Sequence, residues 1–154
     1  MIRKPKAPNH RNILVLHGPN LNLLGEREPD TYGRSTLAEL NTSVMAEARK
    51  LGLCCRIFQR NGEGELIDLL HRHRRWAHAV LINPGAYSHY SYALRDGLTA
   101  VALPAVEVHL TDVSKREPWR RVSVTAEVCE AVVAGKGLGS YIEGLAILAA
   151  KLRG

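Results

Sequence analysis

The sequence predicts an α/β fold built on a five-stranded parallel sheet with helices on both faces. Three observations support this prediction. Short apolar runs alternate with helical patterns along all 154 residues. The runs are continuously apolar, as in strands that helices cover on both sides, instead of alternating with polar residues. No linker, internal repeat or low-complexity segment marks a second domain, and the chain is long enough to bury a sizeable core.

The first eleven residues, MIRKPKAPNHR, are basic and lead into a strand-like run instead of an apolar signal core. We therefore expect residues 1–11 to form a flexible tail and residues 12–154 a single α/β domain. No apolar stretch approaches the roughly 18–20 residues that cross a bilayer, so we predict a cytoplasmic protein without membrane contact. The three cysteines, two of them adjacent, indicate reduced thiols instead of disulfides or zinc ligands.

The first half of the chain predicts two strands and two helices. The apolar run at 12–17 predicts the first strand, and a long loop follows it. Apolar residues spaced three or four apart predict a helix over 36–50, which Gly52 closes. Residues 53–59 predict the second strand, and residues 64–76 the second helix. The inward-facing side chains of that helix are Leu66, Leu69 and Leu70.

The second half continues the alternation. Residues 79–82 predict the third strand, and residues 91–98 a short helix that Ser88 or Ser91 caps. The remaining elements are a fourth strand over 105–110, a fifth over 131–134 and a closing amphipathic helix over 140–152. Five such repeats are typical of the flavodoxin-like order, in which a ligand binds beyond the carboxyl ends of the strands, between strands one and three.

Polar side chains occur where the predicted strands end, and the carboxyl ends of parallel strands meet at one edge of the sheet. These residues are Asn20 after strand one, Asn61 after strand two, Asn83, Ser88 and His89 after strand three, and Glu107 and His109 at the end of strand four. A random scatter of polar residues would not group in this way. We therefore predict an active site at this edge.

Within PAVEVHL, Glu107 and His109 are two residues apart on a strand and so share a face. A carboxylate beside an imidazole fixes its tautomer and raises its basicity, as an acid/base catalyst requires. The alternative is a core histidine that a neighbouring acid satisfies. The position of the other polar residues favours the catalytic interpretation.

The charged segment 25–33 has the composition of an active-site lid and contains Arg27 and Tyr32. A free tyrosine, with a pKa of about 10, is a poor base at neutral pH, but a nearby guanidinium stabilises the phenolate. The pair could then abstract a proton. The alternative is that both residues only anchor a surface loop.

Further loop segments supply groups that could hold an oxyanion, a polyhydroxyl ligand or a carboxylate. Gly18-Pro19-Asn20 makes a rigid turn that can aim an amide, although turn chemistry alone also explains it. Backbone N–H groups and His89 lie at the helix start after Asn83. Leu110 and Thr111 offer main-chain N–H groups and a hydroxyl, and the cationic stretch 115–121 offers guanidinium groups for a carboxylate.

The sequence gives little support to cofactor, metal or nucleic-acid chemistry. The motifs GxGxxG, GxxxxGK[ST] and GxSxG are missing, and His71 and His73 point in different directions on a helix. The net charge is +6, and the densest basic cluster, at 71–75, is explained by a solvated helix terminus. Nucleic acid therefore stays a weak alternative, and we predict acid/base chemistry on a small anion without a metal or cofactor.

The sequence resembles the type II dehydroquinases (3-dehydroquinate dehydratases) over nearly the whole chain beyond the first eleven residues. The motifs that carry the resemblance are LHGPNLNLLGEREPDTYG, NGEGELIDLLH, LINPGAYSHYSYALRDGL, PAVEVHLTDVSKREPWRR and GKGLGSYIEGLAIL. It implies a flavodoxin-like lyase that removes water from 3-dehydroquinate by anti elimination, in the shikimate pathway or in quinate catabolism. It also implies a dodecamer of four trimers.

The resemblance further implies a role for each matching residue. Tyr32, activated by Arg27, takes a proton from C2, and the resulting enolate is stabilised near Asn20. His109, oriented by Glu107, protonates the departing C1 hydroxyl. The substrate contacts fall to Asn83, His89, Leu110, Thr111 and Arg120, and Asp96 reaches the site of the neighbouring subunit.

Four residues depart from the family pattern close to the site: Arg60, Tyr90, Asp112 and Trp119. Because each lies close to the site, we expect them to affect substrate affinity or the lid. None of them removes a group that the elimination needs. Two other functions are weaker alternatives. One is a non-catalytic binding module for a related acid, which the presence of Arg27, Tyr32 and His109 disfavours. The other is a flavin carrier, which would be yellow when purified.

Overall fold

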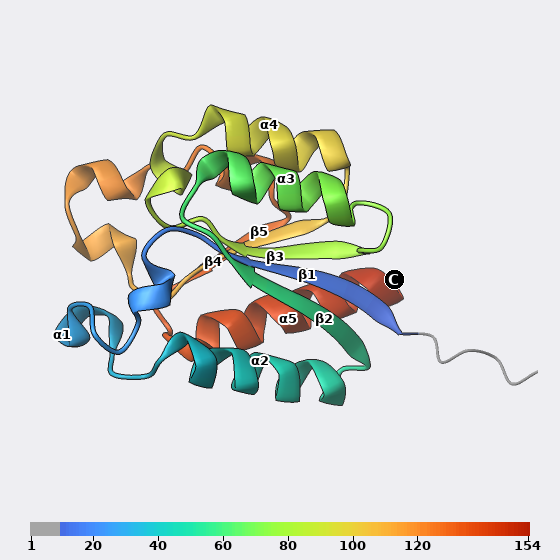
Figure 1. Cartoon of the computed structure of the whole chain (residues 1–154), viewed down its shortest axis with the longest axis horizontal. Coiled ribbons are helices and arrows are strands. Elements are labelled where there is room, and N and C mark those ends of the chain that lie inside the picture. Colours follow the sequence, from blue (N-terminus) through green and yellow to red (C-terminus); the bar gives the residue numbers. More distant parts are fainter. Residues whose placement is uncertain (1–9) are drawn as a thin grey trace, which may run out of the picture.

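The computed structural model of the protein describes residues 10–154, and residues 1–9, most of the predicted tail, lie outside the described residues (Figure 1). Five parallel strands form one sheet in the order β2-β1-β3-β4-β5. This flavodoxin-like order confirms the predicted fold class. The strands are β1 (Arg11–His17), β2 (Leu53–Gln59), β3 (Ala79–Asn83), β4 (Ala105–His109) and β5 (Ala131–Ala134).

Helices cover both faces of the sheet: α3 and α4 lie on one side, and α2 and α5 on the other (Figure 1). The α-helices are α1 (Pro29–Tyr32), α2 (Leu37–Lys50), α3 (Glu63–His73), α4 (Tyr92–Val101) and α5 (Leu138–Arg153). Short 3₁₀ helices occupy the loops: η1 (Leu21–Leu23), η2 (Gly85–His89), η3 (Val113–Lys115), η4 (Pro118–Arg121) and η5 (Ala126–Val128).

The predicted elements are confirmed with small shifts at their ends. Ser91 caps α4 by accepting a hydrogen bond from Leu94 N (3.0 Å), whereas Ser88 bonds back to Gly85 O. The prediction missed α1, a single turn inside the lid segment, which begins at Pro29, a residue suited to the first helical position.

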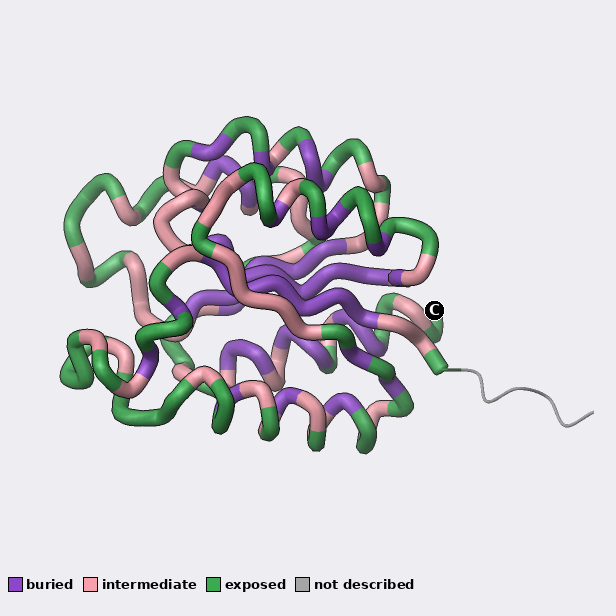
Figure 2. Tube along the Cα trace, viewed as in Figure 1, coloured by how far each residue is buried: buried purple, intermediate pink, exposed green. Residues whose placement is uncertain are grey.

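The core has two apolar layers, and the three central strands between them, β1, β3 and β4, are buried almost throughout (Figure 2). Ile13 and Val15 pack toward α2 and α5, and the alternate residues of β1 pack toward α3 and α4. By the same alternation, His17 lies on the α2/α5 face, next to its β3 partner Asn83. Glu107 and His109 lie on the opposite face.

Two glycines permit close approaches that shape the site. A Cβ on Gly18 would lie 2.5 Å from Pro84 O, so the β1 and β3 loops can meet only without a side chain there. A Cβ on Gly144 would lie 2.7 Å from Leu81 Cδ1 and 2.9 Å from Val108 Cγ1. Helix α5 therefore sits directly on β3 and β4.

Candidate active site

A cavity of about 230 Å³ opens at the carboxyl ends of the strands, among the loops that follow β1, β3 and β4. It lies at the point where the strand order reverses, as predicted for this topology. All but two of the predicted site residues line it: Asn20, Arg27, Tyr32, Asn83, His89, His109, Leu110, Thr111 and Arg120.

The two predicted residues outside the cavity differ in position. Glu107 is fully buried behind His109 and reaches the cavity only through that ring. Asp96 is exposed on α4, away from the cavity. A contact of Asp96 with the site of another subunit therefore stays a prediction from the family resemblance.

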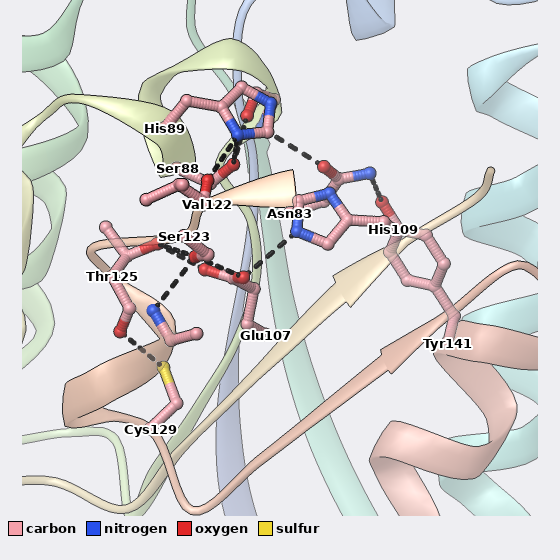
Figure 3. Close-up of polar contacts among 12 residues, drawn as sticks. Asn83, Ser88, His89, Glu107, His109, Val122, Ser123, Thr125, Cys129 and Tyr141 are labelled. Carbon is pink, nitrogen blue, oxygen red and sulfur yellow. Dashed lines mark hydrogen bonds and ion pairs between the residues drawn. The ribbon is translucent and has the colours of Figure 1, made fainter. Parts of the chain in front are cut away.

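His109 is held by a carboxylate (Figure 3). Its Nε2 lies 3.0 Å from Glu107 Oε2, and both side chains are buried. Because an ionised carboxylate can only accept, Nε2 carries the hydrogen of this bond. Nδ1 is then the ring nitrogen left for a ligand, and it can exchange a proton there.

Two hydroxyl groups also donate to the Glu107 carboxylate, one to each oxygen. Ser123 Oγ donates to Oε2 over 2.8 Å, and Thr125 Oγ1 donates to Oε1. Burial by itself would raise the pKa of Glu107, but the bonds from His109, Thr125 and Ser123 outweigh it, so the pKa is lowered. We call Glu107, His109, Ser123 and Thr125 the Glu107 network. It keeps a negative charge directly behind the imidazole.

Two guanidinium groups flank Tyr32. Arg27 Cζ lies 4.6 Å from the centroid of the tyrosine ring, so the predicted neighbours do meet. The hydroxyl itself is engaged by Arg116, whose Nη1 donates to Tyr32 Oη over 2.6 Å. The two contacts fix the position of the ring and of its hydroxyl group at the cavity. The arrangement places a candidate base in the lid segment.

Arg116 is the functional residue that the sequence did not identify individually. It belongs to the cationic stretch 115–121, which was expected to hold a carboxylate of the ligand. Its contact with Tyr32 joins residues 84 positions apart. No local spacing signals such a pairing, and only the fold brings the two segments together.

Asn20 lies in a left-handed conformation with φ of 68°, which asparagine tolerates better than most residues. Its backbone N–H donates to Asn61 Oδ1 (3.0 Å), and Gln59 Nε2 donates to the same oxygen (3.0 Å). Asn61, which was grouped with the site because it follows β2, thus supports the turn that aims Asn20.

His89 approaches the cavity from η2. Its Nδ1 lies 2.7 Å from Val122 O, which can only accept, so Nδ1 carries the hydrogen and Nε2 is left as an acceptor. Burial lowers the pKa of His89, and the neighbouring His109 and Arg120 lower it further. The ring of Trp119 packs edge-on against His89 at 5.2 Å between centroids. His89 is therefore suited to accept a hydrogen bond from a hydroxyl.

Arg120 supplies a cation at the rim of the cavity. Its Nε donates to Glu117 Oε2 over 2.6 Å, and its Cζ lies 4.1 Å from the Trp119 ring centroid. These two contacts hold the guanidinium at the edge of the cavity, and a guanidinium group is suited to binding a carboxylate. Leu110 and Thr111 complete this side of the cavity.

The four residues that depart from the family pattern do not line the cavity. Tyr90 is largely exposed and packs near Tyr87. Arg60 bonds to a backbone carbonyl beside β2, and Asp112 caps the short η3 helix through Ser114. Trp119 differs from the other three, because it contacts two residues that line the cavity, His89 and Arg120.

Among residues 10–154, no group of three or more His, Cys, Asp or Glu side chains is placed to hold a metal ion. Across the same residues, no helix is both long enough and apolar enough to pass through a membrane.

The arrangement brings two proton-transfer groups to one cavity. A phenol beside guanidinium groups can take a proton from a ligand, and an imidazole backed by a buried carboxylate can deliver one. Asn20, Asn83, His89 and Arg120 surround the space between them with groups for hydroxyl, oxyanion and carboxylate oxygens. Such a set suits the removal of water from a hydroxylated acid that has a carbonyl.

Comparison with known proteins connects this geometry with one family. The model of the family described as dehydroquinase class II matches residues 11–149. The 3-dehydroquinate dehydratase of Carboxydothermus hydrogenoformans is 55% identical over 136 residues, which cover 88% of each chain. That of Pelotomaculum thermopropionicum is 51% identical over 140 residues, 90% of this chain and 96% of the relative. The crystal structure of a type II dehydroquinase from Butyrivibrio crossotus matches with a TM-score of 0.88 and 39% identity, over 90% of this chain and 97% of that one.

Proposed function

The chain belongs to the class II dehydroquinase family, and from this premise we propose how it removes water from 3-dehydroquinate. It is a carbon–oxygen lyase that forms 3-dehydroshikimate, and we infer an anti elimination through an enolate. The observation that carries the mechanism is the pair of proton-transfer groups lining one cavity: Tyr32 with Arg116, and His109 with Glu107.

The first step of the proposed mechanism breaks the C2–H bond. The Tyr32 phenolate, stabilised by Arg27 and Arg116, takes the proton, and the electron pair moves into an enolate. The loop of Asn20, held by Asn61, stabilises the developing negative oxygen. Because the proton lies next to a ketone, we expect this step to need no metal or cofactor.

The second step breaks the C1–O bond. The enolate electrons re-form the ketone and a conjugated carbon–carbon double bond, and the C1 hydroxyl departs as water with a proton from His109. Glu107 stabilises the protonated imidazole before the transfer. Solvent then takes the proton from Tyr32 and returns one to His109, which restores both groups.

We assign the remaining groups of the cavity to substrate binding. His89 accepts a hydrogen bond from a substrate hydroxyl, Arg120 binds the carboxylate, and Asn83 with the backbone at Leu110 and Thr111 holds the other oxygens. We further infer, from the family resemblance, a cytoplasmic dodecamer of four trimers in which Asp96 reaches a neighbouring site.

The test measures ultraviolet absorbance while the pure, metal-free protein acts on 3-dehydroquinate. The conjugated product absorbs and the substrate does not, so a rising signal at catalytic protein concentration reports the elimination. Tyr32→Phe removes the base and should lower kcat by about 10²- to 10⁴-fold. Tyr92→Phe, at an exposed tyrosine outside the cavity, is the matched control and should keep the wild-type rate.

Two results would contradict the proposal at different levels. A folded, fully assembled wild-type protein that gives no signal would overturn the assigned reaction and favour the binding-module alternative. Tyr32→Phe with the wild-type kcat would leave the reaction standing and remove Tyr32 as its base.

A further inference from the structure

Behind the cavity, four polar side chains from four elements form one hydrogen-bonded chain inside the α2/α5 face of the core. His17 Nε2 lies 2.8 Å from Asn41 Oδ1 on α2, and His17 Nδ1 lies 2.9 Å from Tyr141 Oη on α5. Tyr141 Oη lies 3.1 Å from Asn83 Nδ2 at the end of β3 (Figure 3). We call Asn41, His17, Tyr141 and Asn83 the His17 network.

The donor and the acceptor of every hydrogen bond in this network follow from the groups at its two ends, Gly85 N–H and Asn41 Oδ1. Gly85 N–H can only donate, and it lies 3.1 Å from Asn83 Oδ1, so the amide of Asn83 directs its Nδ2 toward Tyr141. The tyrosine oxygen accepts that bond, and its own hydrogen points to His17 Nδ1. His17 Nε2 then donates to the Asn41 carbonyl oxygen. Each donor meets an acceptor.

This direction requires a neutral His17, because a protonated ring would place a hydrogen on both nitrogens and leave the Tyr141 hydroxyl without an acceptor. His17 and Tyr141 are fully buried. Burial lowers the pKa of His17 from 6.5 to about 4, against a smaller opposing effect of Asn41. Burial also raises the pKa of Tyr141. Both groups therefore stay uncharged at neutral pH.

A polar network in a core is costly unless it is fully hydrogen bonded, and apolar side chains of similar shape would fill the same space. Asn83 is the one member of the His17 network that lines the cavity. Its Oδ1 is held by Gly85 and one Nδ2 hydrogen by Tyr141. The second Nδ2 hydrogen is left to donate to a ligand oxygen. The network can therefore influence a ligand only through the orientation of the Asn83 amide.

We propose that Tyr141 and His17 are positioning residues for substrate binding, which fix the Asn83 amide so that its free hydrogen meets a substrate oxygen. The proposal rests on the role that the proposed function gives to Asn83. It assigns a task to two residues that do not touch the cavity. Gly144, one turn after Tyr141, lets α5 approach the sheet closely enough for the contact.

The test compares steady-state kinetics of Tyr141→Phe and Ser140→Ala by product absorbance. Tyr141→Phe removes the hydroxyl with little change in volume. It should raise KM about tenfold and change kcat less than about threefold, since an interaction made equally in the ground and transition states appears in KM. Ser140 is also buried on α5 and accepts from Lys136 N (3.1 Å), apart from Asn83. Ser140→Ala should lower stability and leave KM unchanged.

Asn83→Ala separates failure of this proposal from failure of the proposed function. If Asn83→Ala has the wild-type KM, Asn83 does not bind substrate, and the premise falls. If Asn83→Ala raises KM and Tyr141→Phe does not, only the positioning proposal is overturned. In the double variant, the effect of Tyr141→Phe should vanish, because it acts through Asn83. Additive effects on KM would contradict the proposal.

A pair of variants at His17 keeps the test decisive if Tyr141→Phe does not fold. The Asn amide resembles the Nδ1 side of imidazole, so His17→Asn should keep an acceptor for Tyr141 and a KM near that of the wild type. His17→Leu should raise KM about as much as Tyr141→Phe. Nitrogen-15 chemical shifts of His17 should show a neutral ring with hydrogen on Nε2. Hydrogen on Nδ1, or equal KM for both variants, would overturn the proposal.

Discussion

β1 and β4 each end in a buried histidine at the same edge of the sheet, and the two rings lie on opposite faces of it. His109 has a carboxylate, Glu107, as its partner. His17 has an amide oxygen and a phenol. Both rings are nearly inaccessible to solvent, so burial alone does not distinguish them.

The partners decide what each ring can do. A buried carboxylate makes a positive imidazolium tolerable, which a general acid needs. Neutral partners leave the desolvation of a charge uncompensated, so the imidazole stays neutral and keeps one donor and one acceptor. The Glu107 network is therefore suited to transfer a proton. The His17 network is suited to keep the Asn83 amide in one orientation. The same residue type at equivalent positions serves two different tasks.

The largest difference between the two networks should appear when His109 is replaced. His109→Ala removes the general acid, and we expect kcat to fall by about 10²- to 10⁴-fold without unfolding the protein. Product absorbance measures the rate, and circular dichroism checks the fold. A folded variant with the wild-type rate would show that another group protonates the leaving hydroxyl.

The second difference between the two networks should appear in how the free energy of unfolding depends on pH. The folded chain binds a proton at His17 only near pH 4, whereas the unfolded chain binds one near 6.5. Between these values the unfolded state holds more protons, so stability falls as the pH falls, by about 3 kcal/mol in total. Glu107, whose pKa is lowered from 4.5, loses its contribution only below that value.

Urea unfolding of the wild type and His17→Asn at a series of pH values between 7 and 4 measures this effect. The variant has no titrating group at this position, so its stability should fall less steeply, and the remaining histidines are common to both proteins. Parallel curves for the two proteins would contradict a neutral His17 in the folded state.

The third difference concerns the charge behind His109. Glu107→Gln keeps the shape and one acceptor oxygen but loses the charge. A hydrogen bond to a charged group contributes about 1.5–3 kcal/mol, so kcat should fall roughly 10- to 100-fold, less than in His109→Ala. A wild-type rate would remove Glu107 from the activation of His109.

The smallest effect should follow from removing one hydroxyl of the Glu107 network. Ser123→Ala deletes one of three hydrogen bonds to the carboxylate, and the half-buried site admits water in its place. We expect a loss of about 1 kcal/mol in the free energy of unfolding and a rate near that of the wild type. A rate loss as large as that of Glu107→Gln would mean that Ser123 itself sets the carboxylate's charge.

The elements and their order could be predicted because apolar periodicity and the helix ends are local signals. The strand over 53–59 and the strand over 131–134 match β2 and β5 residue for residue. Most of the predicted site residues line the cavity, because the topology places the strand ends and the loops that follow them at one edge. Their assigned roles stay predictions.

The contacts between distant segments could not be predicted. The hydrogen bond of Arg116 to Tyr32 depends on how two loops fold over the cavity. His17 seemed only the last residue of a strand, and its bond to Tyr141 joins residues 124 positions apart. The partners of a buried side chain depend on how whole helices and strands pack together. The spacing of residues in one sequence does not predict that packing.

The placement of β1 beside β3 also sets when the enzyme becomes active during folding. β2, α2 and α3 come between these two strands in the chain, yet β1 must pair with β3 before the loops of Asn20 and Asn83 can meet. Parallel pairing of distant segments forms slowly compared with helices. A refolding sample should therefore recover its helical circular dichroism before its first turnover. The return of activity then shows that β1 and β3 have already paired.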